Sequence, residues 1–139
     1  MALKFEKTLS YQFMQLGAIA RQEALAPLRT HGLQTGDDVI LFWLADQSRM
    51  TLEDMRIGLD MPPHQFNALI GRLDSAKMLE SQADETDGTI HLFLSAIALN
   101  VLQDIHKNLK ALDKELTADL SAHKTKKLKK LLSKISNLF

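Results

Sequence analysis

The chain has 139 residues, of which 45% are hydrophobic and 24% charged, and its 17 Lys and Arg residues balance 17 Asp and Glu residues. That length is typical of one domain with its own hydrophobic core. The absence of cysteine excludes disulfides, thiolate catalysis and cysteine-based redox sensing, and the sequence lacks the apolar run of about 18 residues that a membrane span requires.

The first 49 residues predict two helices. Apolar side chains recur every three or four positions over residues 4–30, the spacing of one face of a long helix. Pro27 should kink or end that helix, and Gly32 is a natural stop. Thr35 is placed to cap a second helix over residues 36–46. The first residues lack the apolar stretch of a secretory signal, so we expect a cytoplasmic protein.

Residues 50–95 form a compact module between the long terminal helices. Two short helices are predicted at residues 51–59 and 62–76. Two apolar runs follow at residues 78–79 and 90–94, with a polar loop at residues 81–89 between them. Helix, tight turn, helix and hairpin is the order of a winged helix-turn-helix, whose second helix enters a DNA major groove.

Local signals in this module agree with that order. Thr51 and Asp54 have nearly the spacing of a capping box, and Pro62 suits a first helical position. Asp87-Gly88 is the strongest turn signal and lies where a hairpin tip belongs. One apolar face of the second helix follows from four residues spaced by three or four positions, namely Phe66, Leu69, Ile70 and Leu73.

The C-terminal third predicts two further helices. Ser95 precedes an apolar pattern that continues for roughly 26 positions, about 39 Å of helix. Ser121 precedes a last helix with six apolar residues. A module of 46 residues cannot cover such apolar terminal helices, so we expect a symmetric homodimer built from the first, fifth and sixth helices.

The segment LDMPPHQFNALIGRLDSAKMLE, preceded by TLEDM, resembles the helix-turn-helix of the MarR family of bacterial transcriptional regulators. Gly32-Leu33-x-Thr35 resembles the start of the family's second helix, and the long terminal helices are similar to its dimerisation region. The resemblance implies a mainly α fold, with one domain over residues 1–139. Its dimerisation helices would be 1–31 and 96–139, and its winged helix-turn-helix 33–95.

The resemblance implies a dimeric regulator that reads a pseudo-palindromic site in double-stranded DNA. The predicted outward face of the second helix carries side chains that can bind bases or phosphates, with a minor wing contact after it, and these are His64, Gln65, Asn67, Arg72 and Thr89. Family members also hold a small aromatic effector between the dimer helices and the module. Plausible walls for it here are Tyr11, His31, Phe42 and Trp43.

The wing and the charge distribution depart from the family pattern. Gly88 and Thr89 occupy places where relatives carry arginines, and Asp84 and Glu85 add negative charge beside them. Residues 50–95 carry net charge −5 and residues 96–139 carry +5. An alternative function is therefore open, in which the winged-helix dimer has lost DNA binding and uses its acidic module to engage a basic protein surface.

Other chemistry finds little support in the sequence. No phosphate-binding glycine loop, catalytic triad or metal-ligand spacing of the five histidines is present, so we expect no enzyme, cofactor or metal site. The last helix carries a run of six lysines, at positions 124, 126, 127, 129, 130 and 134. That run is typical either of a basic amphipathic helix that meets phosphates or of a solvated helix face.

Overall fold

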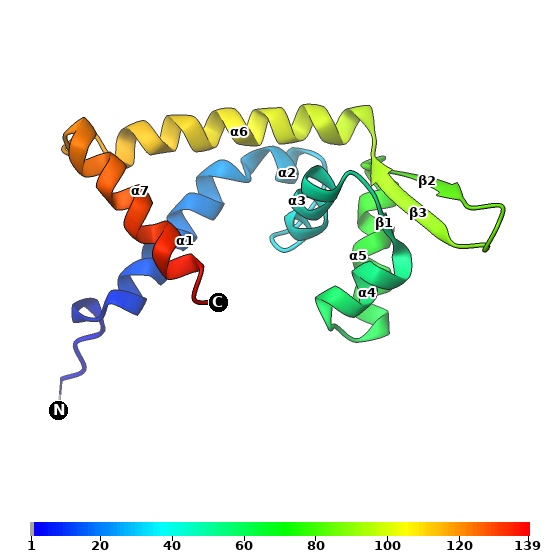
Figure 1. Ribbon diagram of the computed structural model, residues 1–139, viewed down its shortest axis with the longest axis horizontal. Coiled ribbons are helices and arrows are strands. Elements are labelled where there is room, and N and C mark those ends of the chain that lie inside the picture. The colour runs from blue at the N-terminus through cyan, green and yellow to red at the C-terminus, as the bar shows by residue number, and fades with distance from the viewer. Residues whose placement is uncertain (1) are drawn as a thin grey trace.

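The computed structural model describes residues 2–139 and is mainly helical (Figure 1). A short 3-10 helix, η1 (Phe5–Lys7), precedes seven α-helices in that range, which are α1 (Leu9–Ala24), α2 (Ala26–Thr30), α3 (Asp38–Gln47), α4 (Leu52–Leu59), α5 (Pro63–Ser75), α6 (Ala96–Leu116) and α7 (Ala122–Ser136). The three strands are β1 (Met50–Thr51), β2 (Leu79–Ala83) and β3 (Ile90–Leu94). Within residues 2–139, none of the helices combines the length and apolarity needed to cross a bilayer.

The long first helix breaks where Pro27 predicted. Helix α1 ends at Ala24, Leu25 separates the two helices, and α2 begins at Ala26 with Pro27 in its first turn. Proline is tolerated there because the first turn of a helix has no intrahelical partner for its backbone N–H groups. Thr8 caps α1 by accepting a hydrogen bond from the backbone N–H of Tyr11 at 3.3 Å.

The predicted capping role of Thr35 is wrong. Helix α3 starts at Asp38, two residues later than expected, and Thr35 makes no capping hydrogen bond. The carboxylates of Asp37 and Asp38 instead accept hydrogen bonds from the backbone N–H groups of Gln34 and Gly36, at 2.9 and 3.0 Å. A carboxylate is a stronger acceptor than a hydroxyl, and here two of them organise the turn before α3.

The winged module follows its predicted order, with shifted boundaries. The hydroxyl of Thr51 caps α4 by accepting from the backbone N–H of Asp54 at 3.1 Å, and Asp60 ends α4 in the left-handed region at φ +47°. Pro62 precedes α5, and Pro63 occupies its first turn.

The sheet has the antiparallel order β1-β3-β2. Strand β3 is central, with Met50 opposite Leu92 on one side and Leu79 opposite Leu94 on the other. The polar residues 81–83 were predicted as loop but continue β2 as far as Ala83, opposite Ile90. Backbone pairing with β3 outweighs their weak strand propensity, so the wing loop is only residues 84–89.

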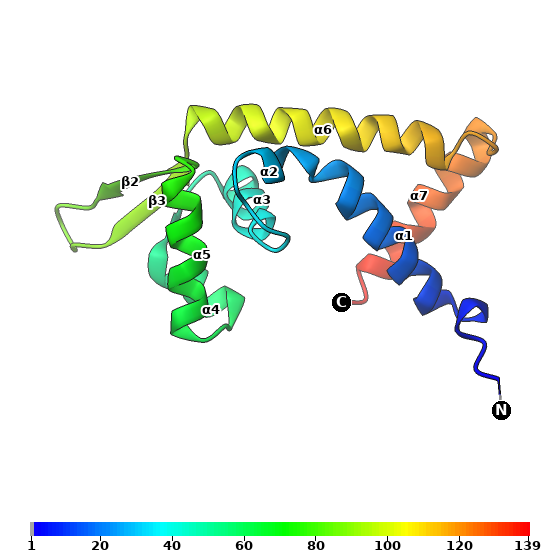
Figure 2. The same ribbon diagram turned by 180° about the vertical axis from the view of Figure 1, so that it is seen from behind.

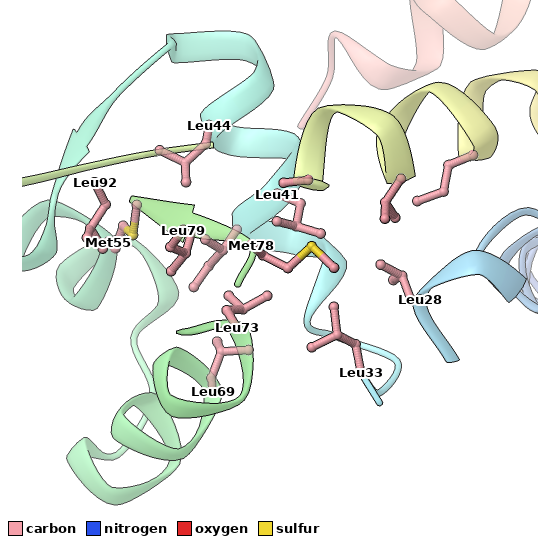
Figure 3. Packing of buried hydrophobic residues seen from close by; sticks show 14 of the residues in the cluster. Leu28, Leu33, Leu41, Leu44, Met55, Leu69, Leu73, Met78, Leu79 and Leu92 are labelled. Carbon is pink, nitrogen blue, oxygen red and sulfur yellow. The ribbon is translucent and has the colours of Figure 1, made fainter. Parts of the chain in front are cut away.

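The hydrophobic core lies between the winged module, α2, α3 and the buried face of α6. Figure 3 shows its side chains converging from α2, α3, α4, α5 and the sheet. Its most deeply buried members include Leu28, Leu41, Leu44, Met55, Leu73 and Met78. The apolar face predicted for the second helix of the module is confirmed, because Phe66, Leu69 and Leu73 are buried. This core fixes α5 at the surface of the module.

The terminal helices extend away from that core. Helix α6 runs along one side of the molecule, with the winged module at one end and α7 at the other (Figures 1 and 2). Ser95 and Ser121 cap α6 and α7 as predicted, each accepting a hydrogen bond at 3.1 Å from the backbone N–H three residues on. One face of α6 is buried, whereas α7 has no buried residue in the protomer.

Candidate nucleic-acid interface

Helix α5 presents its N-terminal half to solvent. Figure 2 shows this half at the end of the module that lies farthest from α6. His64, Gln65 and Asn67 are exposed, as is Ala68 beside them, while the opposite face is docked in the core. Imidazole and amide groups can donate and accept hydrogen bonds, so the structure brings three of the predicted residues onto one accessible helix face.

Arg72 has a different position from the one predicted. Its Nε donates to Asp37 Oδ2 at 3.0 Å and its Nη2 donates to Asp37 Oδ1 at 2.8 Å, a two-point contact. Asp37 is buried, with 1% exposure of its side chain, whereas Arg72 is half-buried. The hydrogen bonds that Arg72 donates to Asp37 raise the pKa of Arg72. The guanidinium therefore ties the C-terminal half of α5 to the start of α3.

The wing loop is organised by its own acidic residues. Thr86 donates from both its backbone N–H and its hydroxyl to Asp84 Oδ1, and Thr89 donates in the same way to Asp87 Oδ1, at 2.9 and 2.7 Å. The hydrogen bond from the Thr86 hydroxyl leads the causes that lower the pKa of Asp84, and the backbone hydrogen bond from Thr89 leads those for Asp87. Both carboxylates therefore stay ionised to a lower pH than an ordinary aspartate.

The wing provides no cation for a DNA backbone. Residues 78–95 contain no Lys or Arg. The hydroxyl of Thr89, predicted as a minor wing contact, lies 3.2 Å from Nε2 of His91 in addition to its bond with Asp87. Gly88 has φ +72° at the tip, a conformation that favours glycine. The geometry of this loop is that of an acidic turn held together internally.

The structure does not bring the four predicted effector-binding residues together. Of these four residues, Phe42 alone lines the hollow of about 250 Å³ that lies between α1, α3 and α6. Tyr11 packs against Phe5, and its hydroxyl accepts from Gln15 Nε2 at 2.6 Å. His31 lies at the end of α2, beside α5.

Trp43 is a packing residue between α3 and α4. A Cβ built at Gly58 would lie 2.9 Å from Cη2 of the Trp43 ring. That separation is too short for a normal contact, so the ring occupies space that only a glycine leaves free. The half-buried indole therefore packs against α4, away from the hollow that Phe42 lines.

Sequence reasoning missed the two residues that close the polar side of this hollow. Arg21 donates from Nη2 to Asp38 Oδ1 at 2.8 Å, and both residues line the hollow together with Phe42. The adjacent acids Asp37 and Asp38 are visible in the sequence as a doublet before an apolar run. Such a doublet is usual at a helix N-terminus, where negative charge is favoured by the macrodipole, so it does not reveal burial. In residues 2–139, no group of His, Asp or Glu side chains is placed to hold a metal ion.

Comparison with solved structures identifies the fold. The chain is similar to a mutant of MepR from a multidrug-resistant S. aureus clinical isolate, with 20% identity, a TM-score of 0.75, and coverage of 96% of this chain and 99% of that one. It is also similar to wild-type apo MarR from E. coli, with 16% identity, a TM-score of 0.69, and coverage of 92% and 96%. The S. aureus MepR–DNA complex gives 20% identity, a TM-score of 0.67, and coverage of 96% and 99%.

No protein-family model and no curated protein matches the sequence. The likeness to solved structures nevertheless spans nearly the whole chain, including the terminal helices. The predicted resemblance to MarR-type transcriptional regulators is therefore confirmed at the level of the fold.

Proposed function

We propose that the protein is a dimeric, DNA-binding transcriptional regulator that reads a pseudo-palindromic site with α5. The observation that carries this proposal is the exposed face of His64, Gln65 and Asn67 at the tip of the module, in a chain with the fold of a regulator that has been solved with DNA bound. Amide side chains can pair with adenine through two hydrogen bonds, and an imidazole can donate or accept. Arg72 is a positioning residue in this scheme, because its guanidinium is bound to Asp37.

Dimerisation through the terminal helices supports the reading of two half-sites. Helices α1 and α7 expose large apolar side chains in the protomer, with Phe13 at 40%, Leu16 at 50% and Leu131 at 46%. Exposed apolar helix faces of this extent are typical of interaction sites. A twofold arrangement buries both copies of the same face and places two α5 helices against one side of a DNA duplex.

A small aromatic effector is a further part of the proposal. The hollow between α1, α3 and α6 is lined mainly by apolar residues with Phe42 on its wall, and a volume of about 250 Å³ exceeds the roughly 150 Å³ known to admit benzene in an engineered protein cavity. It lies between a predicted dimerisation helix and the module that carries α5. Titration with simple phenols, followed through DNA affinity, tests this part separately.

The test of DNA reading uses fragments recovered from genomic DNA by the purified protein. Fluorescence anisotropy then measures the affinity of the wild type and of variants for the recovered fragment. We expect His64→Ala/Asn67→Ala to lower affinity more than tenfold, because each base contact contributes about 1–3 kcal/mol. Gln103→Ala, an exposed polar residue on α6, is the matched control. Wild-type affinity in the double variant would exclude α5 as the reader.

A second candidate function follows from the acidic wing. The module over residues 50–95 carries net charge −5, and hydrogen bonds lower the pKa values of Asp84 and Asp87 below the ordinary range, which favours their charged forms. Such a surface favours a basic protein partner and opposes phosphates. In this case the winged-helix dimer would recover no DNA even at 50 mM salt.

Charge reversal in the wing separates the two candidates. Glu85 is exposed and makes no hydrogen bond in the wing network described above. If α5 reads DNA with the wing beside it, Glu85→Arg should raise affinity and make the dependence of log K on log salt steeper by about one unit per subunit. Glu115→Arg, with the same charge change at the far end of α6, is the control. A basic protein partner would instead bind the Glu85→Arg variant more weakly.

A further inference from the structure

Two neighbouring aspartates connect α1 with α5. Asp37 and Asp38 are each 1% exposed, and they stand side by side where α3 begins. Arg21 of α1 donates to Asp38 at 2.8 Å, and Arg72 of α5 donates to Asp37 at 2.8 and 3.0 Å. A helix of the terminal region and the exposed helix of the winged module are thus bound to two consecutive residues at the start of α3.

The turn before α3 is bound to the same carboxylates. Asp37 Oδ2 accepts from the backbone N–H of Gln34 and from Nε of Arg72, and Asp38 Oδ1 accepts from the backbone N–H of Gly36 and from Arg21. A buried carboxylate that loses its cation is strongly unfavourable. Each aspartate therefore moves with its arginine, and the turn moves with both aspartates.

Asp37 and Asp38 face two separate hollows of the surface. Arg21 and Asp38 line the apolar hollow between α1, α3 and α6. Asp37 and Arg72 line another hollow along α5, which His64 and Gln65 also border. A displacement of α1 can therefore reach α5 through the Arg21–Asp38 ion pair, the peptide bond between the two aspartates and the ion pair with Arg72.

We propose that Asp37 and Asp38 form a coupling joint through which the position of α1 sets the orientation of α5. Arg21 is then a positioning residue for α5, although it does not touch that helix. Packed elements shift between discrete arrangements rather than deforming continuously, so loss of the Arg21–Asp38 contact frees the turn over residues 34–36 and loosens the Arg72 anchor. The consequence for DNA affinity rests on the function proposed above, whereas the coupling itself does not.

Hydrogen–deuterium exchange tests the coupling without DNA. In Arg21→Gln, we expect the backbone amides of α5 and of residues 34–37 to exchange at least threefold faster than in the wild type, with other module helices unchanged. Arg21 is suited to this test because its side chain is 46% exposed and is not part of the hydrophobic core. Arg21→Lys keeps the charge and should restore most of the protection.

The control is Arg56→Gln, which breaks an exposed ion pair with Glu53 inside α4. That pair links no two elements, so its loss should leave the exchange of α5 unchanged. Unchanged exchange of α5 in a folded, dimeric Arg21→Gln protein overturns the coupling joint. Equally fast exchange throughout the whole module overturns it too, because that pattern means general destabilisation.

A double-mutant cycle tests the consequence for DNA binding. Arg21→Gln and Arg72→Gln should each weaken binding, and the double variant should weaken it at least threefold less than the product of the two single effects, since both changes release the same joint. Multiplicative effects would show that the two arginines act independently and overturn the proposal. If the wild type binds no DNA, the proposed function fails, while the exchange experiment still decides the coupling.

Discussion

The ion pair between Arg72 and Asp37 should account for a measurable part of the stability of the winged module. Removing one partner of a buried pair typically costs about 3–5 kcal/mol, because a charge is left buried and uncompensated. Arg72 is 33% exposed, and water reaching the guanidinium screens part of the attraction. Arg72→Met keeps the length of the side chain, so we expect it to lower the free energy of unfolding by about 2–3 kcal/mol.

Neutralising the partner should recover part of that loss. In Arg72→Met/Asp37→Asn, residue 37 is an amide, whose burial without a cation costs less than burial of a carboxylate. The double variant should therefore be destabilised by about 1–2 kcal/mol less than the sum of the two single variants. Coupling of that size between Asp37, just before α3, and Arg72 on α5 would assign the loss to the pair rather than to packing.

Urea denaturation, followed by the fluorescence of the single tryptophan, Trp43, measures these free energies. All variants are compared at one protein concentration, because the unfolding of a dimer depends on it. Arg56→Met is the control, and its exposed pair within α4 should leave the midpoint unchanged. A loss below about 0.5 kcal/mol for Arg72→Met, the range of ordinary surface changes, would refute the view that Asp37 anchors α5.

Three further predictions concern the core, the wing and the terminal helices. Leu73→Ala removes a side chain with 0% exposure and should cost about 3 kcal/mol in urea denaturation; a loss below 1 kcal/mol would mean that α5 is not docked as described. Thr86→Val should raise the pKa of Asp84 toward its ordinary value, because it removes the leading hydrogen bond that lowers it, and a carboxyl NMR titration measures this. Since the folded pKa is the lower one, the wing keeps this stabilisation above the ordinary aspartate pKa of about 3.9 and loses it as pH falls through the folded value; an unchanged titration in the variant would exclude the hydroxyl as the cause. Leu131→Lys places a charge on the exposed apolar face of α7 and should shift sedimentation from dimer to monomer, whereas an intact dimer would remove α7 from the interface.

Local sequence signals predicted the elements of this fold well. The apolar spacing in α5, the serine caps of α6 and α7 and the break near Pro27 depend on neighbouring residues only, and all are present. The order of helix, turn, helix and hairpin follows from the same signals. It was sufficient to indicate the fold that solved structures share with this chain.

Tertiary structure decided what the polar side chains do. Arg72 lies on the predicted helix, but its partner Asp37 is 35 residues away in sequence, so no local pattern could show that its guanidinium is engaged. The same holds for Arg21 with Asp38, and for residues 81–83, which become strand because β3 offers backbone partners. The spacing of apolar residues predicts which face of a helix is buried, because the hydrophobic effect is non-directional and requires no particular partner. Ion pairs and strand pairing depend on two segments meeting, and only the folded chain determines which segments meet.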